Sequence, residues 1–309
     1  TGSAAISVGA GKVNKDHGSL TQRIHAELRT SKCQNESIEV PRRRPNGKPM
    51  NIRSIAATRY ITPLREGGSL PGLVEADDQG LYVLKFHGAG QGRKALIAEL
   101  IVGELGRAAG LPVPEIVLMH LDADLSKTEG DPEIQSLLRN SAGLNLALDY
   151  LPGSVTFDPL ICHIPESLAS RVVWLDAFAM NVDRSARNTN MLMWHRGLWL
   201  IDHGAALYVH HQDETFVGNS GSPFALVKEH VLLSWATALR EADAEMRQRL
   251  SGDVVDDVVD AVPEAWLTDA EGAIEPQARR DNYRQFLKAR LQSSHIFVEE
   301  AIRAQSMHV

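Results

Sequence analysis

One stretch of the sequence combines side chains that could carry out group transfer. Asp183 stands on a predicted loop after an apolar helix, and Asn188 follows five residues later. A short predicted hairpin then ends in Asp202-His203-Gly204. Asp and Asn oxygens are the hard ligands that magnesium prefers, and a further Asp can orient or deprotonate an acceptor hydroxyl. We interpret Asp183 as that acid–base group, and Asn188 and Asp202 as metal ligands for phosphoryl transfer.

Two upstream residues strengthen this interpretation. Lys85 ends an apolar strand, from which its ammonium could reach phosphate oxygens. Glu99 lies on the next predicted helix, where it could pair with Lys85 and hold it; Glu104 competes for that role nearer the helix end. Each match also occurs in ordinary loops, strands and helices. It is their combination that favours a functional site.

A glycine-rich stretch between two predicted strands could wrap the phosphates of a nucleotide with backbone N–H groups. Its candidate residues are Gly67, Gly68, Ser69 and Gly72. A second candidate, residues 88–92, opens a helix and could bind an anion there. Its spacing is not the dinucleotide fingerprint, and no strand–helix–strand unit follows it.

Four further polar or bridging positions have roles that the sequence leaves open. Backbone groups at Asp149 and Leu151, between the two halves of the chain, could bind adenine, an assignment that rests on position alone. Asp176, inside the helix before Asp183, either faces solvent or braces the catalytic loop. Arg184 either contacts substrate or braces that loop by ion pairing, and we favour the brace.

These side chains need elements that hold them at fixed separations. From Ile52 to Phe86 the pattern predicts strands, and a helix follows over 93–109, which Gly110 and Pro112 end. Two more strands are predicted at 115–121 and 144–150, with a helix between them. Beyond Pro152 the predicted elements are mostly helices. They cover residues 167–181, 223–239, 242–250, 254–259 and 280–304, interrupted by a strand pair at 191–194 and 198–202.

The chain therefore divides into three predicted parts. Residues 1–49 lack apolar periodicity, and we expect a disordered or artificial leader, with Met50 as a plausible natural start. Residues 50–151 form a nucleotide-binding part, a small antiparallel sheet with one helix. Residues 152–309 form a mostly helical part with the catalytic loop and the metal site.

Bulk composition excludes some classes of protein. The formal net charge of −7 over 309 residues argues against a nucleic-acid partner, since phosphate backbones need a basic face. Cys33 and Cys162 have no metal-ligand spacing, so a disulfide framework is not expected and a reducing cytoplasm fits. No apolar run approaches the roughly 20 residues that span a bilayer. We expect a soluble cytoplasmic protein without a membrane span.

The order of these motifs resembles the HipA-like kinases and, more distantly, the phosphatidylinositol kinases. The residues that carry the resemblance are Gly67–Gly72, Lys85, Glu99, Asp183-Arg184, Asn188 and Ile201-Asp202-His203-Gly204. It covers residues 52–304 and implies an α+β, two-lobed protein-kinase-like fold with a mostly helical C-lobe. It also implies ATP and Mg²⁺ as cosubstrates and a hydroxyl acceptor, on protein Ser/Thr or a small molecule. In that scheme Lys85 contacts the α- and β-phosphates, Glu99 anchors it, and Asp183 is the catalytic aspartate.

The loop after Asp183 departs from the family pattern. Family members commonly have His after Asp-Arg, whereas Ser185 follows here. The loop is also longer, so Asn190, directly before an apolar strand, competes with Asn188 as a metal ligand. We do not expect residues 1–49 to supply the extra N-terminal subdomain of the bacterial HipA toxins, so the protein substrates and toxin role of those proteins do not transfer safely.

Other functions fit part of the sequence. A metal-dependent hydrolase could bind zinc or iron through a cluster near the second Asp motif. Its candidate ligands are Asp202, His203, His210, His211, Asp213 and Glu214. Lys85 and Glu99 would then have no role, and adjacent histidines point apart on a strand. A catalytically inactive kinase-like scaffold, or a nucleotidyl transferase on the same fold, also stays open.

Overall fold

The computed structural model describes residues 50–64, 70–90, 92–212, 216–268 and 275–307. The predicted leader at 1–49, which includes Cys33, lies outside these residues. In the described part of the chain, no helix is both long and apolar enough to cross a membrane.

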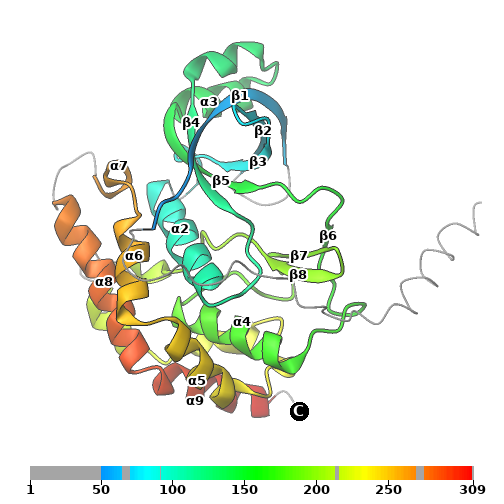
Figure 1. Cartoon of the computed structure of the whole chain (residues 1–309). Helices are drawn as coiled ribbons and strands as arrows, with labels where there is room; N and C mark the ends of the chain where they lie inside the picture. The colour runs from blue at the N-terminus through cyan, green and yellow to red at the C-terminus, as the bar shows by residue number, and fades with distance from the viewer. Residues whose placement is uncertain (1–49, 65–69, 91, 213–215, 269–274, 308–309) are drawn as a thin grey trace, which may run out of the picture.

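Five strands close into a small barrel at one end of the molecule (Figure 1). In barrel order they are β1 (Ser54–Pro63), β2 (Gly72–Ala76), β3 (Leu81–Lys85), β5 (Gly143–Asp149) and β4 (Ile116–Leu121). Alternate residues of β2 and β3, such as Val74 and Leu84, are fully buried. This alternation is that of strands with one face on a core.

One strand pairing makes the sheet differ from the predicted antiparallel sheet. β1 and β4 pair in parallel, over Ser54–Ala56 and Leu118–His120, and this pairing closes the barrel. Register shifts in β1 opposite β2 mark irregularities that bend the ten-residue strand. The bend lets the first residues of β1 turn away from β2 and reach β4. The alternation of apolar residues predicts a buried face, but it does not specify which strand pairs with which.

Two helices accompany the barrel, and both lie where the pattern predicts a helix, although the predicted fold counts only one of them with the sheet. α2 (Arg93–Ala108) lies between the barrel and the other helices, and α3 (Pro132–Asn140) covers the far side of the barrel (Figure 1). A 3-10 turn, η1 (Ala123–Thr128), precedes α3. Ile134 and Leu138 of α3 are buried in the barrel core.

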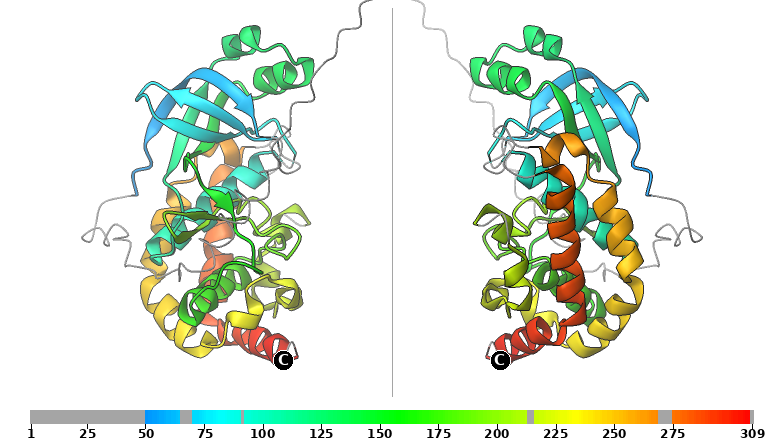
Figure 2. Two further views of the ribbon diagram at one scale, coloured as in Figure 1. Left: turned by 90° about the vertical axis from the view of Figure 1, so that its right-hand side faces the viewer. Right: turned by 90° about the vertical axis from the view of Figure 1, so that its left-hand side faces the viewer.

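The rest of the described chain is mostly helical, with a small second sheet (Figures 1 and 2). The helices are α4 (Glu166–Phe178), α5 (Leu239–Arg249), α6 (Gly252–Asp260), α7 (Glu264–Leu267), α8 (Pro276–Gln292) and α9 (His295–Ser306). The 3-10 turns are η2 (Tyr208–His211), η3 (Phe216–Gly221), η4 (Ala225–Glu229) and η5 (Leu233–Trp235). The second sheet has the order β6 (Val155–Thr156), β7 (Met191–Trp194), β8 (Gly197–Leu200).

The predicted strand pair at 191–194 and 198–202 is present as the β7–β8 hairpin. Two of the predicted helices, however, are wrong. His195 and Arg196 in the hairpin turn have φ of 47° and 64°, as a tight turn of this kind requires. Residues 223–239 form 3-10 turns instead of a helix, and Phe224 there has a left-handed backbone with φ of 56°. The predicted helix over 280–304 is two helices, because the chain breaks at Ser293, whose hydroxyl bonds the carbonyl of Ala289.

The C-terminal elements hold α2 at both ends. Arg93 in its first turn donates to the carbonyl of Thr268, after α7, at 2.8 Å. At the other end, Arg249 of α5 donates to the carbonyl of Ala109 at 3.2 Å. Gly110 then stops the helix with φ of 75°, a conformation that favours glycine. The helix that carries Glu99 is thus fixed from the helical part of the molecule.

A tryptophan links the helical part to the barrel. Trp266 of α7 is buried and donates its indole N–H to the carbonyl of Leu144, on β5, at 3.1 Å. The largest hydrophobic core is also shared, since it includes Leu100 of α2 and Leu148 of β5 together with Trp174 of α4. Barrel, α2 and helices are therefore packed on one another.

Candidate active site

The ammonium of Lys85 lies between two carboxylates from different elements. Lys85 ends β3 and donates to Glu99 of α2 at 2.7 Å and to Asp202 at 2.5 Å. Asp202 lies just beyond β8, so segments 117 residues apart meet at one ammonium. The predicted contact between Lys85 and Glu99 is present, and the contact with Asp202 adds a second one.

Burial and charge act against each other at Glu99, which is fully buried. Burial opposes its ionisation, but the charge of Lys85 and the contact with His203 outweigh burial and lower the pKa of Glu99 to about 2. His203 is also fully buried, with Nδ1 at 3.5 Å from Glu99 Oε1. Glu104, the competing candidate, instead pairs with Arg107. Glu99 is therefore an ionised, buried anchor for Lys85.

Both candidate asparagines lie beside Asp183. Asn188 Nδ2 donates to Asp183 Oδ2 at 2.9 Å, and Asn190 Nδ2 lies 3.3 Å from the same oxygen. Asn190 also donates to the main-chain carbonyl of Asp183 at 3.0 Å. Because each amide gives its N–H groups to Asp183, its oxygen is left as the atom that could bind a cation. Asn188 and Asn190 both stay candidate metal ligands.

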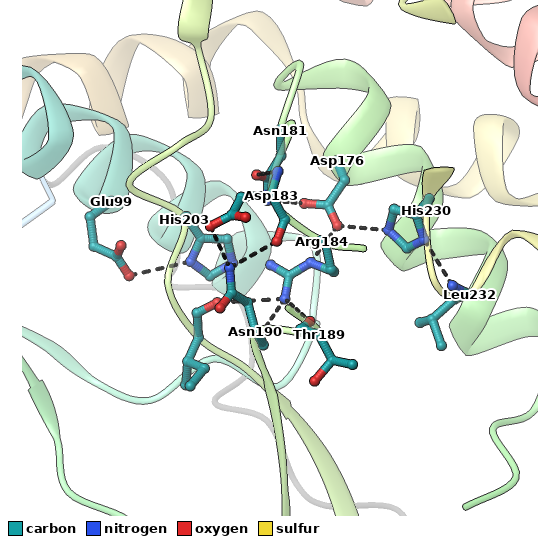
Figure 3. A network of polar contacts seen from close by, with 11 residues as sticks. Glu99, Asp176, Asn181, Asp183, Arg184, Thr189, Asn190, His203, His230 and Leu232 are labelled. Atoms are coloured by element: carbon teal, nitrogen blue, oxygen red, sulfur yellow. Dashed lines mark hydrogen bonds and ion pairs between the residues drawn. The ribbon is translucent and has the colours of Figure 1, made fainter. Parts of the chain in front are cut away.

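Asp176 and Arg184 form an internal brace under this loop (Figure 3). Both side chains are buried, and Arg184 Nε donates to Asp176 Oδ2 at 2.5 Å. Asn181 donates to the other oxygen of Asp176 at 2.9 Å, and its own Oδ1 accepts the N–H of Asp183. Burial opposes the ionisation of Asp176, but Arg184 and the neighbouring His230 outweigh it and lower its pKa well below the ordinary value. The open question about Asp176 and Arg184 is answered in favour of the brace.

Arg184 also connects the Asp183 loop to the segment that carries Asp202. Its guanidinium contacts the carbonyls of Asn190 and Ile201, and Ile201 donates its N–H to the same Asn190 carbonyl at 3.1 Å. Asp202 follows with a left-handed backbone, φ 55°. The separation of Asp183 from Asp202 is thus set by buried main-chain contacts.

The sequence profile of one protein family, described as HipA-like kinase, matches residues 58–298, which is most of the chain. The chain belongs to the HipA-like kinases. Its structure is similar to the Helicobacter pylori proinflammatory kinase CtkA, with a TM-score of 0.54 and 11% identity over 82% of this chain and 99% of that chain. It is also similar to a Golgi casein kinase with Mn/ADP bound, with a TM-score of 0.46 and 10% identity over 80% of this chain and 74% of that chain. The search of curated proteins finds no match.

Membership of the HipA-like kinases confirms the family that the motif order predicted, and with it a kinase, which is a phosphotransferase. The likeness to CtkA confirms a kinase-like mixed α/β fold. One feature of that fold had to be corrected, since the predicted antiparallel sheet is a closed barrel with one parallel pairing.

The predicted phosphate loop falls mostly outside the described residues, which exclude Gly67, Gly68 and Ser69. Gly72 begins β2, where a Cβ would lie 2.5 Å from the Tyr60 ring and 3.2 Å from Phe86. Packing of β2 against these rings therefore accounts for Gly72 on its own. In the second glycine stretch, Gly92 is the N-cap of α2 and has φ of 66°.

The predicted adenine contacts lie where the barrel meets the rest of the chain. Asp149 ends β5, and its N–H already donates to the carbonyl of Glu115 at 2.9 Å. The N–H of Tyr150 likewise donates to the carbonyl of Leu81. Leu151 is buried just beyond them. Of the two predicted residues, Asp149 has only its carbonyl to offer adenine, so the prediction rests mainly on Leu151.

A clustered metal site of the hydrolase type does not form within the described residues, where no three His, Cys, Asp or Glu side chains come together. His210 instead contacts the hydroxyl of Tyr283 through Nδ1, at 2.9 Å. Burial, with the nearby His211 and Lys94, lowers the pKa of His210. Asp213 and Glu214 lie outside the described residues. The described chain gives the hydrolase alternative no support.

One member of the network was not predicted. His230 lies just beyond η4, 54 residues from Asp176, and its Nε2 lies 3.0 Å from Asp176 Oδ2 (Figure 3). No motif contains it, and it falls in a region that the sequence predicts as an ordinary helix. Only the tertiary fold brings it to the loop.

Proposed function

We propose that this HipA-like kinase depends on ATP and magnesium and transfers the γ-phosphate to a hydroxyl group of a protein Ser/Thr or a small molecule. The observation that carries the proposal is the position of Lys85 between Glu99 and Asp202. Buried Glu99 holds the ammonium in place, and half-buried Asp202 offers a carboxylate beside it. A fixed cation next to a metal-binding carboxylate is the arrangement that phosphoryl transfer uses.

In the proposed reaction, Asp183 accepts the proton of the acceptor hydroxyl. The acceptor oxygen bonds to the γ-phosphorus, the bond from that phosphorus to the bridging oxygen breaks, and ADP leaves with the electron pair. Lys85 binds the α- and β-phosphates. The contacts of Asn188 and Asn190 to Asp183 hold its carboxylate in one orientation.

Magnesium fits the donor set of this site. Asp202 offers a carboxylate oxygen, and Asn188 and Asn190 offer amide oxygens, all hard ligands of the kind magnesium prefers. When bound there, magnesium would neutralise charge on the phosphate oxygens. We propose Asp202 with Asn188 or Asn190 as its protein ligands.

The roles proposed for these residues suggest that the chain has a nucleotide-binding part and a catalytic part. We propose residues 50–151 as the nucleotide-binding part, with Leu151 and the loop at Gly67–Gly72 around the nucleotide, and residues 152–309 as the part with Asp183 and the metal ligands. The cytoplasm remains the proposed location, since a sequence with only two cysteines suits a reducing compartment.

Nucleotide binding tests this proposal through thermal stability. At a 100-fold excess over Kd, a ligand stabilises the folded state by about 2.7 kcal/mol, which raises Tm by roughly 5–10 °C for a chain of this size. ATP with magnesium should give such a shift in the wild type and in Asp124→Asn, an exposed control on η1. Asp202→Asn should lose the magnesium-dependent part of the shift.

Three outcomes would contradict the proposal in different ways. If no nucleotide raises Tm at millimolar concentration, with or without magnesium, the chain does not bind ATP. If ATP with magnesium raises Tm but the wild type releases no ADP and labels no acceptor, the inactive scaffold is the better description. A mass increase of a nucleotide instead of a phosphate on the product would indicate nucleotidyl transfer.

A further inference from the structure

His230 is tied to the catalytic loop by its side chain. The ring is almost fully buried, and its Nδ1 accepts the N–H of Leu232 at 3.0 Å. A nitrogen that accepts carries no proton, so the ring proton is on Nε2. Nε2 therefore donates to Asp176 Oδ2, at 3.0 Å. His230 serves Asp176 as a neutral hydrogen-bond donor.

The main chain at His230 is tied to the same loop. Val231 donates its N–H to the carbonyl of Arg184 at 3.1 Å. Ser185 and His230 form an isolated antiparallel bridge. The segment thus runs beside the two residues that follow Asp183, and His230 is aligned by contacts on both sides of its Cα.

Asp176 links His230 to the catalytic groups through its hydrogen bonds. Its Oδ1 accepts from Asn181, which in turn binds the N–H of Asp183, and its Oδ2 accepts from both Arg184 and His230. Arg184 reaches the carbonyl of Asn190, one candidate metal ligand. A rotation of the Asp176 carboxylate away from this orientation would therefore displace both Asp183 and Asn190.

We propose that His230 is a positioning residue for phosphoryl transfer, acting through Asp176 and Arg184 on Asp183 and Asn190. This inference rests on the proposed function for its effect on rate. Without the His230 hydrogen bond, Asp176 Oδ2 is held by Arg184 alone, and the carboxylate can rotate about its side-chain bonds. Ground-state nucleotide binding at Lys85 should change little, because the contacts of Lys85 are with Glu99 and Asp202 and not with Asp176, Arg184 or His230.

Paired substitutions separate positioning from bulk stability. His230→Phe keeps a ring but removes both hydrogen bonds, and His230→Gln keeps an amide N–H that can reach Asp176. His120→Gln, an exposed position on β4, is the matched control. With ATP and magnesium, the full-length chain is followed by ADP release, by Tm, and by amide hydrogen exchange across residues 183–190.

His230→Phe should lower kcat by roughly 10–100-fold, the scale of a small misplacement of catalytic groups, with KM for ATP unchanged within about twofold. Amide exchange should accelerate in residues 183–190 and not in the barrel, and His230→Gln should recover most of the lost kcat. His120→Gln should match the wild type throughout.

Unchanged kcat and unchanged exchange in His230→Phe would overturn the proposal. So would faster exchange over the whole chain with no recovery in His230→Gln, which would mean a purely structural role. If His230→Phe does not fold, His230→Gln decides: near wild-type kcat and exchange support positioning by the Nε2–H donor, and the loss of both overturns it. If the wild type releases no ADP, the proposed function fails, while the local exchange comparison still tests the link from His230 to the loop.

Discussion

Replacing Lys85 by methionine would leave Glu99 buried with no ammonium beside it. Removing one partner of a buried pair typically costs about 3–5 kcal/mol, because the remaining charge is uncompensated. Lys85→Met should therefore lower both stability and ADP release. The double variant Lys85→Met/Glu99→Gln removes that charge, so its free energy of unfolding should return to within about 1 kcal/mol of the wild type while activity stays lost. Urea unfolding and ADP release measure the two effects separately.

The pH dependence of stability gives a further test of the comparison between the wild type and the Lys85→Met/Glu99→Gln variant. The pKa of Glu99 is lowered from 4.5 to about 2, so its ionised form stabilises the wild type above pH 4.5. That contribution is lost as the pH falls from about 4.5 to about 2. The double variant has no carboxyl at this position and should show a smaller loss of stability over that window. Equal losses in both proteins would contradict the pKa assignment.

At the scale of single elements, the end of α2 offers a test of how the helix that carries Glu99 is held. Gly110 has φ of 75°, and a Cβ there would lie 2.6 Å from an Arg249 nitrogen. An L-residue in the left-handed region costs about 1–2 kcal/mol, and Arg249 would also have to shift from the carbonyl of Ala109. Gly110→Ala should therefore lower the urea midpoint with an unchanged m-value.

The control for this prediction is Gly130→Ala, because a Cβ at Gly130 meets no atom within 4 Å. Its urea midpoint should stay near that of the wild type or rise slightly, since alanine reduces the entropy of the unfolded chain. A drop in Gly130→Ala as large as in Gly110→Ala would mean that the helix end is not the cause.

Features that a short stretch of sequence determines could be predicted, whereas features that depend on contacts between distant segments could not. Lys85 at the end of a strand, Glu99 on the next helix and the β7–β8 hairpin follow from patterns within a short stretch. The parallel pairing of β1 with β4 joins segments some sixty residues apart, and no local pattern encodes it. His230 joins the site in the same way, since its role arises only from the position of Asp176 in the folded chain.

At the scale of the whole molecule, Trp266 donates a direct hydrogen bond from the helical part of the chain to the barrel. Trp266→Phe keeps a large ring but leaves the carbonyl of Leu144 without its indole donor, at a cost of about 1–3 kcal/mol. Calorimetry should show a Tm lower by several degrees, at roughly 2–4 °C per kcal/mol. Trp199→Phe is the matched control, since within the described chain its indole N–H has no hydrogen-bond partner. An equal drop in both variants would show that lost ring packing, not the hydrogen bond, dominates.

Closure of the barrel also limits where a protein acceptor could bind. A peptide that is captured as an added strand needs a sheet edge with unpaired N–H and C=O groups. Each barrel strand pairs with a neighbour on both sides, but β1 does so with β4 only over Ser54–Ala56 and pairs with β2 alone beyond that point. In the described chain, the small sheet does have edges, at β6 and β8, and Val155 of β6 is 63% exposed. An acceptor held by strand addition would therefore join either the far part of β1 or the small sheet, whose middle strand, β7, begins directly after Asn190.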